Sequence, residues 1–474
     1  MSRCHRAQFV ATSKPENPRG PKPAARFWCI IAHGHSASWP QIQHGHRSTR
    51  VRFSCVRRPI GRRAEATTVH GSMPGLTDGS WMFCSIQRKD RGNLTMRVTA
   101  ILTNTARGMA LTAMACAAAV LLPTSAHAQT VGAVFTATNG AEGNEVLMYL
   151  RDGDGRLTFA DDFPTGGNGT GAGLGNQGGL ALSGNNKWLF VVSAGSGELS
   201  VFRVRRDHLA LTDVSATGGD RPISVTEHAG VVYVLDGAGG GEISGFTVDE
   251  RGNLSAIENS TRGLSGADET GPAQIQFSAD GRVLVVTEKA TNMIDTFVVD
   301  DNGVAGNAMV HESSGMTPFG FDVNRRNVLI VSEAFGGAPD ASAVSTYRIF
   351  PDGSLKIGAA SVATTETAAC WIVSARSDRY TYTTNTGSGS VSGYSVHRRL
   401  GDLELLDENG VTGMVGDGTR PIDAAVSRDG RFMYVLAAGT NEIVSFEVHE
   451  QDGSLTNLER TGGLPAGANG LIAR

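Results

Sequence analysis

Short runs of β-branched and aromatic residues alternate with Gly-, Asn- and Asp-rich turns over most of the chain after residue 129. The stretch YTYTTNTGSGSVSGYSV, residues 380–396, contains one strand that ends at an Asn, a Gly/Ser turn, and a second alternating strand that ends near an aromatic residue. Six other segments are similar to this second strand: EVLMYL, ELSVFRV, EISGFTV, MIDTFVV, AVSTYRI and EIVSFEV. Seven similar strands predict a repeat fold rather than isolated hairpins.

The spacing of these copies identifies the kind of repeat. Their aromatic residues follow one another at intervals of 53, 44, 51, 50, 47 and 52 residues: Tyr149, Phe202, Phe246, Phe297, Tyr347, Tyr394 and Phe446. Residues 420–461 contain four short strands, IDAAVS, RFMYVLA, EIVSFEV and SLTNLER, separated by Gly- and Asp-rich turns. A period near 50 with four strands per copy is typical of propeller blades. We predict an all-β fold, a seven-bladed β-propeller over 129–474 with four antiparallel strands per blade.

The two ends of this region predict how the ring closes. The first copy begins at AVFTATN, which corresponds to the second strand of a blade, and the chain ends in PAGANGLIAR, which resembles an unpaired first strand. We therefore expect the C-terminal strand to complete blade 1, because pairing the two ends leaves no exposed sheet edge there. We expect the propeller to be a monomer.

The N-terminal region has a different composition. Residues 1–95 contain 16 Lys and Arg, 4 acidic residues and no apolar period, so we interpret them as a non-native or disordered extension. Residues 96–128 have Arg97 and Arg107 near their start, a short apolar run, and Ala126-His127-Ala128 before Gln129. This order predicts a secretory signal peptide cleaved after Ala128, and a periplasmic or secreted protein without a membrane span.

Charge and cysteine content restrict the partners of the exported part. Residues 129–474 carry 24 Lys and Arg against 42 Asp and Glu, a net charge of −18, which argues against nucleic-acid binding. Cys370 is the one cysteine after the predicted cleavage site, so no intrachain disulfide can form there.

Two glycine-rich motifs have structural explanations. GLGNQG, residues 173–178, matches the dinucleotide-binding pattern G-x-G-x-x-G, but the strand LALS follows it where that site needs a helix. DGDG, residues 152–155, lacks the later acidic ligands of a calcium loop and is read as a turn. The histidines lack close metal-ligand spacing. We predict no cofactor and no metal.

The candidate chemistry lies where the second strand of each blade ends near one mouth of the central channel. The residues at these ends are Asn139, Ala194, Asp236, Glu288, Glu333, Asn385 and Ala437. Asn and Asp also cap turns, whereas Glu is a poorer turn former. Two neighbouring carboxylates could serve as acid and base, so we take Glu288 and Glu333 as catalytic candidates.

Four further residues are candidates for substrate binding. Asp236 and Asn385 belong to the same ring of strand ends, and Arg221 and Arg420 lie in loops that lead into first strands on the same face. The two arginines could hold an anionic substrate, or they could neutralise the carboxylates.

Blades such as NQGGLALSGNNKWLFVVSAGSGELSVFRV make nearly all of 129–474 resemble the seven-bladed lactonase family, which includes propeller-type 6-phosphogluconolactonase and carboxymuconate cyclase. The resemblance implies a hydrolase that acts on a small lactone or carboxylate at the channel mouth. In the cyclase branch it implies a His, an Arg and a Glu in the site. Glu333 in VLIVSEAF fits the Glu, whereas Ala273 and Phe319 stand at the His and Arg positions.

The missing His and Arg leave a second hypothesis open. YTTNTGSGSVSGYSV also resembles the YVTN repeats of surface propellers. The alternative is therefore a non-catalytic exported propeller that binds a ligand or a protein partner on the channel-mouth face.

Overall fold

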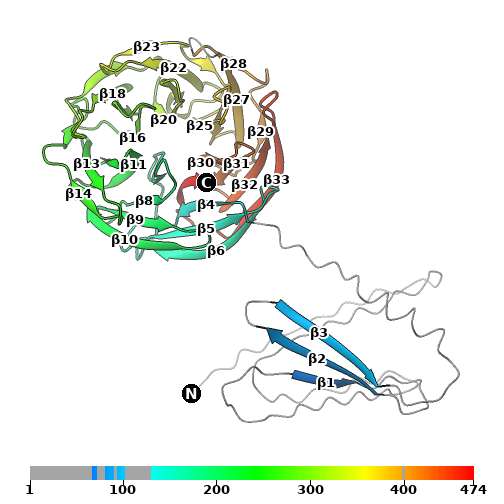
Figure 1. Ribbon diagram of the computed structural model, residues 1–474. Coiled ribbons are helices and arrows are strands. Elements are labelled where there is room, and N and C mark those ends of the chain that lie inside the picture. Colours follow the sequence, from blue (N-terminus) through cyan, green and yellow to red (C-terminus); the bar gives the residue numbers. More distant parts are fainter. Residues whose placement is uncertain (1–66, 72–80, 90–92, 102–129, 398–400) are drawn as a thin grey trace, which may run out of the picture. The chain divides into compact units, whose positions relative to one another are not determined.

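The computed structural model describes residues 67–71, 81–89, 93–101, 130–397 and 401–474, which are drawn in colour in Figure 1. The chain divides into two units, Met1–Leu122 and Pro123–Arg474. In the described part of the chain, no helix has the length and apolar character needed to cross a membrane.

The first unit contains one antiparallel sheet, in the order β1 (Thr67–Gly71), β2 (Trp81–Lys89) and β3 (Asn93–Ile101). Strand β3 includes the first residues of the predicted signal peptide. Residues 102–128, with the predicted cleavage site at Ala128, lie outside the described residues. The extension and the signal peptide therefore stay predictions.

The second unit is a ring of seven sheets, each of which is one blade (Figure 1). Blade 1 consists of β34 (Asn469–Ala473), β4 (Gly132–Ala137), β5 (Glu145–Arg151) and β6 (Leu157–Pro164). Blade 2 consists of β7 (Leu180–Leu182), β8 (Trp188–Ser193), β9 (Glu198–Val204) and β10 (Leu209–Ala216). Blade 3 consists of β11 (Pro222–His228), β12 (Val231–Asp236), β13 (Glu242–Val248), β14 (Leu254–Ala256) and β15 (Arg262–Gly263).

The remaining blades repeat this order. Blade 4 consists of β16 (Pro272–Phe277), β17 (Val283–Glu288), β18 (Met293–Val298) and β19 (Met309–Glu312). Blade 5 consists of β20 (Pro318–Val323), β21 (Val328–Glu333), β22 (Ala343–Ile349), β23 (Leu355–Ile357) and β24 (Val362–Ala363), with a 3₁₀ turn at Phe335–Gly337. Blade 6 consists of β25 (Ala369–Ser374), β26 (Tyr380–Asn385), β27 (Ser390–Val396), β28 (Leu403–Leu405) and β29 (Gly413–Met414). Blade 7 consists of β30 (Pro421–Val426), β31 (Phe432–Ala437), β32 (Glu442–Val448) and β33 (Leu455–Gly462).

The ring closes as the sequence predicts. Strand β34 pairs antiparallel with β4, placing Ile472 opposite Phe135, and the amide of Arg474 donates to the carbonyl of Ala133 at 2.9 Å. The last strand of the chain is thus the innermost strand of blade 1, and the prediction of C-terminal closure is confirmed.

The repeated aromatic residue of the third strands supplies the core. All seven of these side chains are at most 4% exposed: Tyr149, Phe202, Phe246, Phe297, Tyr347, Tyr394 and Phe446. Tyr149 of blade 1 belongs to the same buried cluster as Tyr434 of blade 7, so the cluster spans two sheets. Both faces of each sheet meet a neighbouring blade, which explains why the strands contain near-continuous apolar runs.

Most first strands are preceded by a residue in the left-handed backbone conformation. Arg221, Thr317, Ala368 and Arg420 have φ between 47° and 61°, and each directly precedes a first strand. The carbonyl of Arg221 accepts a hydrogen bond from the amide of Gly237 at 2.9 Å, just past the end of the second strand. This left-handed residue turns the incoming chain so that the first strand runs back down the channel wall.

Candidate functional site

The channel has two unlike ends. At the loop end, the second strands finish and the first strands begin. At the hairpin end, the first strands turn into the second strands. Each first strand lies at the inner edge of its sheet, so its channel-facing edge has no strand partner.

Side chains of one blade pair with these free edges on the next blade. Gln274 accepts from the amide of Phe321 at 2.7 Å and donates to the carbonyl of the same residue at 2.8 Å. Asp322 accepts from the amide of Ser374 at 2.9 Å, and Asp423 accepts from the amide of Leu471 at 3.0 Å. Unpaired buried N–H groups are costly, so these contacts hold the blades together and make the channel wall polar.

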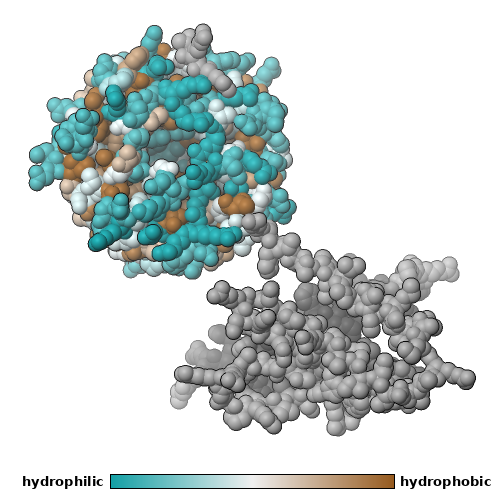
Figure 2. All heavy atoms as spheres, viewed as in Figure 1, coloured by the Kyte–Doolittle hydropathy of each residue, from teal (hydrophilic) through white to brown (hydrophobic). Residues whose placement is uncertain are grey.

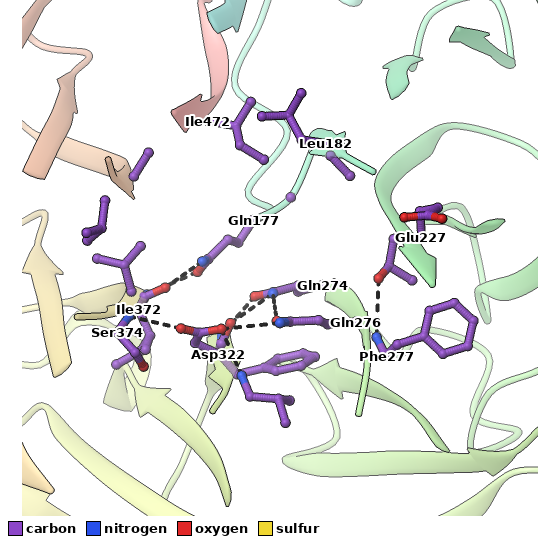
Figure 3. Close-up of a pocket in the computed structure, with 18 of the residues that line it drawn as sticks. Gln177, Leu182, Glu227, Gln274, Gln276, Phe277, Asp322, Ile372, Ser374 and Ile472 are labelled. Carbon is purple, nitrogen blue, oxygen red and sulfur yellow. Dashed lines mark hydrogen bonds between the residues drawn. The ribbon is translucent and has the colours of Figure 1, made fainter. Parts of the chain in front are cut away.

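The glycine-rich motif 173–178 crosses the channel near the loop end, and we call it the plug. Gln177 forms a pair of hydrogen bonds with Ile372 of blade 6, donating at 2.7 Å and accepting at 3.0 Å (Figure 3). Its own amide donates to Ala273 of blade 4 at 3.0 Å. Asn176 accepts from the indole of Trp371 at 2.7 Å and from Asn469 of blade 1 at 3.0 Å. A motif that resembles a nucleotide-binding loop therefore links blades 1, 4 and 6.

An apolar cluster surrounds the plug at the loop end. It contains Ala273, Phe319, Ala334, Cys370 and Trp371, all at most 8% exposed. The rings of Phe319 and Trp371 lie 4.8 Å apart, centroid to centroid. The positions at which the family resemblance implies a His and an Arg are thus part of a packed apolar patch.

One cation covers this patch. The ammonium group of Lys289 lies 4.9 Å from the Phe319 ring centroid and donates to the carbonyls of Gly175 at 2.8 Å and Pro272 at 2.6 Å. Burial lowers the pKa of Lys289 to about 8, because the charged form loses its hydration. Burial also raises the pKa of the Cys370 thiol to about 12, which makes this thiol unreactive at neutral pH.

The predicted catalytic carboxylates are not open to the channel. Glu333 is 0% exposed and accepts from Gly315 at 2.8 Å, Ser345 at 2.5 Å and Ser361 at 2.5 Å. Burial raises its pKa, and these hydrogen bonds oppose the rise. The carboxylate lies inside blade 5 and ties its second strand to the loop that enters the blade.

Glu288 has an equivalent position in blade 4. It is 0% exposed and accepts from the amide and hydroxyl of Ser265 at 2.9 and 2.8 Å, and from the hydroxyl of Thr291. Next to it, the pKa of Asp295 is raised to about 8, mainly by burial and in part by the negative charge of Glu288. Asp295 is therefore the proton-bearing member of a buried carboxyl pair at neutral pH.

The predicted substrate-binding residues separate into two groups. Asp236 is 1% exposed and accepts from Thr217 at 2.9 Å, and burial raises its pKa to about 6. Asn385 is 0% exposed and donates to Ser390 at 3.0 Å and Ser392 at 2.8 Å. Arg221 and Arg420 are exposed in the loops before first strands. The two buried residues of this set and the two glutamates occupy equivalent positions at the ends of the second strands of blades 3, 4, 5 and 6: Asp236, Glu288, Glu333 and Asn385. Each of them contacts its own blade and the adjoining loops.

The space in the channel lies on the other side of the plug. A cavity of about 590 Å³ extends from Gln177 to the hairpins that end the first strands. Its polar wall includes Gln274, Gln276 and Asp322, which form a connected set in Figure 3: Gln274 donates to Gln276 at 3.1 Å, and Gln276 donates to Asp322 at 3.2 Å. Figure 2 shows a hollow at the centre of the ring within a mostly hydrophilic face.

Asp423 is a second carboxylate of this cavity. It is 3% exposed, and burial raises its pKa to about 7 against hydrogen bonds from the amides of Ala424 at 2.8 Å and Leu471 at 3.0 Å. A carboxylate with this pKa exchanges a proton near neutral pH, which is what a general base needs. In the described part of the chain, no cluster of three or more His, Cys, Asp or Glu could hold a metal ion.

The sequence reasoning missed the residues at the hairpin end. Arg325, Arg376 and Arg428 line the cavity opening from the hairpins of blades 5, 6 and 7. The sequence signal was a basic residue soon after each of three consecutive first strands, in NRRN, ARSD and SRDG.

Comparison with known proteins identifies the family. The model of the seven-bladed β-propeller lactonase family matches residues 180–349 and 341–466, which is more than half of the chain. The chain belongs to this family. The function expected of the family is lactonase-like and directed at a small molecule. No curated protein sequence matches the chain.

Solved structures agree on the fold of this lactonase-family chain. A periplasmic gluconolactonase from Pseudomonas aeruginosa aligns with a TM-score of 0.57 at 16% identity, covering 71% of this chain and 98% of the other. A provisional 6-phosphogluconolactonase from Bacteroides uniformis aligns with a TM-score of 0.56 at 17% identity, covering 72% of this chain and 99% of the other. At these identities the likeness concerns the fold alone.

Proposed function

We propose that this chain is an exported lactonase-like propeller that binds and hydrolyses a small lactone in the central channel, which the substrate enters from the hairpin end. One observation carries the proposal: the cavity of about 590 Å³ is lined by carboxylate and carboxamide groups that include Asp423, whereas Glu288 and Glu333 do not line it. This volume falls in the range typical of small-molecule sites.

Asp423 is the proposed general base. A water molecule adds to the lactone carbonyl carbon while its proton moves to Asp423. The ring C–O bond then breaks, and the ring oxygen takes up the proton. The pKa of about 7 suits both transfers. The second N–H of the Gln276 side chain and the carboxylate of Asp322 are available to the substrate hydroxyls.

A site at the loop end is the competing location for the same reaction. There Glu333 would act as the acid or base beside Glu288, Asp236 and Asn385, with Arg221 or Arg420 holding an anionic group. For substrate to reach Glu333, the segment around Gly315 and Ser361 has to move, because both residues contact its carboxylate.

One assay decides between the two locations. Lactone hydrolysis by the full chain is measured for wild type, Asp423→Asn, Glu333→Gln and the control Asp340→Asn, an exposed residue outside the cavity. We expect Asp423→Asn to lower kcat by about 100-fold or more, with little change in the other two variants. If kcat falls by a comparable factor only in Glu333→Gln, the reaction takes place at the loop end instead.

A non-catalytic ligand-binding propeller is the second candidate function. The packing of Ala273 and Phe319 into an apolar cluster supports it, since the resemblance implies a His and an Arg at these positions. If wild type hydrolyses no lactone above background, the binding function replaces the catalytic one.

Export rests on the composition of residues 96–128. Secreted material should begin at Gln129, and N-terminal sequencing checks this. Recovery of any residue before Met96 from secreted protein would contradict it.

A further inference from the structure

The hairpins of blades 5, 6 and 7 touch one another around the opening of the cavity. Arg325 contacts Asp378 of the next hairpin at 3.1 Å and donates to the carbonyl of Arg376. A Cβ placed on Gly430, in the hairpin of blade 7, would lie 3.0 Å from the Cβ of Arg376. These contacts bring three arginines to one side of the opening. We call Arg325, Arg376 and Arg428 the arginine rim.

The acidic residues of these hairpins are already engaged by other arginines. Asp378 binds Arg325, and Asp429 binds Arg151 at 3.0 Å. Among the described residues, no acidic side-chain oxygen lies within 4.0 Å of the guanidinium of Arg376 or Arg428. Both residues are exposed. Two permanent positive charges therefore stand at the opening without a counter-ion from the described residues.

Charge changes sign along the channel. Below the arginine rim, the wall carries Asp322 and Asp423, and neither forms an ion pair in the described part of the chain. Glu227 also lines the cavity, from blade 3 near the hairpin end, and its carboxylate accepts from the amides of Gly184 at 3.0 Å and Gly230 at 2.7 Å. An anion deep in the cavity would be repelled, whereas an anion on the side of the opening formed by blades 5, 6 and 7 would be attracted to the arginines. This is notable because the propeller region as a whole has a net charge of −18, so a basic opening is not expected from its composition.

We propose that the arginine rim is an anion-binding site that holds the anionic end of the channel ligand at the hairpin end. The carboxylate or phosphate of the ligand binds Arg376 and Arg428 at the opening. Its hydroxylated body points inward to Gln276 and Asp322. This deepens the proposed function by naming the subsite for the anionic end of the ligand, and it rests on that function only for the position of the body in the channel.

Calorimetry with the full chain at low ionic strength tests the anion site. The probes are D-gluconate, which has a carboxylate and a polyol body, sorbitol, which is a neutral polyol of the same length, and inorganic phosphate. Gluconate is not hydrolysed, so its binding does not depend on catalysis. We expect gluconate to bind more tightly than sorbitol and phosphate to compete with gluconate.

The variants separate the rim from general surface charge. Arg376→Gln/Arg428→Gln should weaken gluconate binding by about 5- to 20-fold, and the difference from wild type should shrink at 0.5 M salt, as expected for exposed charges that are screened. The control Arg282→Gln/Arg326→Gln removes two exposed arginines of the neighbouring hairpins that do not line the cavity, and it should change binding less than twofold.

Equal binding of gluconate and sorbitol would overturn the proposal, as would equal losses in the rim and control variants. A protein that binds gluconate through the rim but hydrolyses no lactone contradicts the proposed function and leaves the anion site standing. If the rim variants hydrolyse lactone as wild type does and gluconate does not bind, the anion site is wrong and the proposed function stands. Circular dichroism of each variant confirms that the fold is retained.

Discussion

The two ends of the channel use the same residue types for opposite purposes. At the loop end, Glu288 and Glu333 are fully covered and accept hydrogen bonds from serine, threonine and glycine groups. Between the plug and the hairpin end, Asp322 and Asp423 line a cavity of about 590 Å³, although Asp423 itself is 3% exposed. A carboxylate at a strand end is therefore informative about function only when the space next to it is known.

The difference between the ends begins with the plug. Residues 173–178 form hydrogen bonds to blades 1, 3, 4 and 6 near the loop end, and Lys289 of blade 4 donates to Gly175 of the plug. In the described part of the chain, no equivalent segment closes the hairpin end, where the first-to-second turns contain two to five residues. The loop end is thus built for closure and the hairpin end for access. The predictions below test this contrast.

The largest expected effect comes from opening the ring that carries both ends. Deleting Gly467–Arg474 removes β34, its pairing with β4 and the hydrogen bond between Leu471 and Asp423. Blade 1 loses its innermost strand and exposes an apolar sheet edge, so we expect loss of the cooperative thermal transition. Circular dichroism melting checks this, with a deletion of residues 1–66 as the control. A truncated chain with unchanged thermal stability would disprove the closure.

A smaller effect is expected from loosening the plug. Gln177→Ala leaves both the amide and the carbonyl of Ile372 without partners in a buried environment, so we expect a loss of about 2–4 kcal/mol in the free energy of unfolding. The matched variant Gln276→Ala, at the open cavity where water can take over the contacts, should cost less than about 1 kcal/mol. Urea unfolding measures both, and equal losses would contradict the contrast between the ends.

The buried carboxyl pair at the loop end predicts the pH dependence of stability. The pKa of Asp295 is about 8 in the folded state against an ordinary value of 3.8, so the folded protein holds this proton more tightly than the unfolded chain does. The contribution of Asp295 to the free energy of unfolding is therefore complete below about pH 4. It falls as the pH rises to about 8, by at most about 1.4 kcal/mol per pH unit.

Asp295→Asn tests this prediction. The variant cannot ionise at this position, so its stability relative to wild type should increase between pH 5 and pH 9 in urea unfolding. Asp340→Asn, an exposed change, should leave the difference flat. A relative stability of Asp295→Asn that does not depend on pH would show that Asp295 does not hold its proton in the folded state.

The fold could be predicted from the sequence because each blade repeats the same strand pattern. Seven buried aromatic residues at intervals near 50, and an unpaired strand at each end of the region, are local signals that add up along the chain. Five of the seven predicted ends of second strands were located correctly, at Asp236, Glu288, Glu333, Asn385 and Ala437. The other two strands end earlier than predicted: β4 ends at Ala137 rather than Asn139, and β8 ends at Ser193 rather than Ala194.

The surroundings of these strand ends could not be predicted in the same way. Whether Glu333 is open or covered depends on Gly315, Ser345 and Ser361, which lie up to 28 residues away. The plug depends on contacts between Gln177 and Ile372, 195 residues apart. Such contacts leave no periodic trace in a single sequence. The arginine rim did leave one, a basic residue in three successive hairpins, and reading the turns for charge as well as for shape would have found it.

The smallest effect is expected at the hairpin end. Arg376 and Arg428 are exposed and have no acidic partner among the described residues, so Arg376→Gln/Arg428→Gln should change the free energy of unfolding by less than about 0.5 kcal/mol. Urea unfolding at low salt measures the change. A loss above about 2 kcal/mol would mean that these arginines hold the hairpins together, and the contrast between a closed structural end and an open binding end would then be wrong.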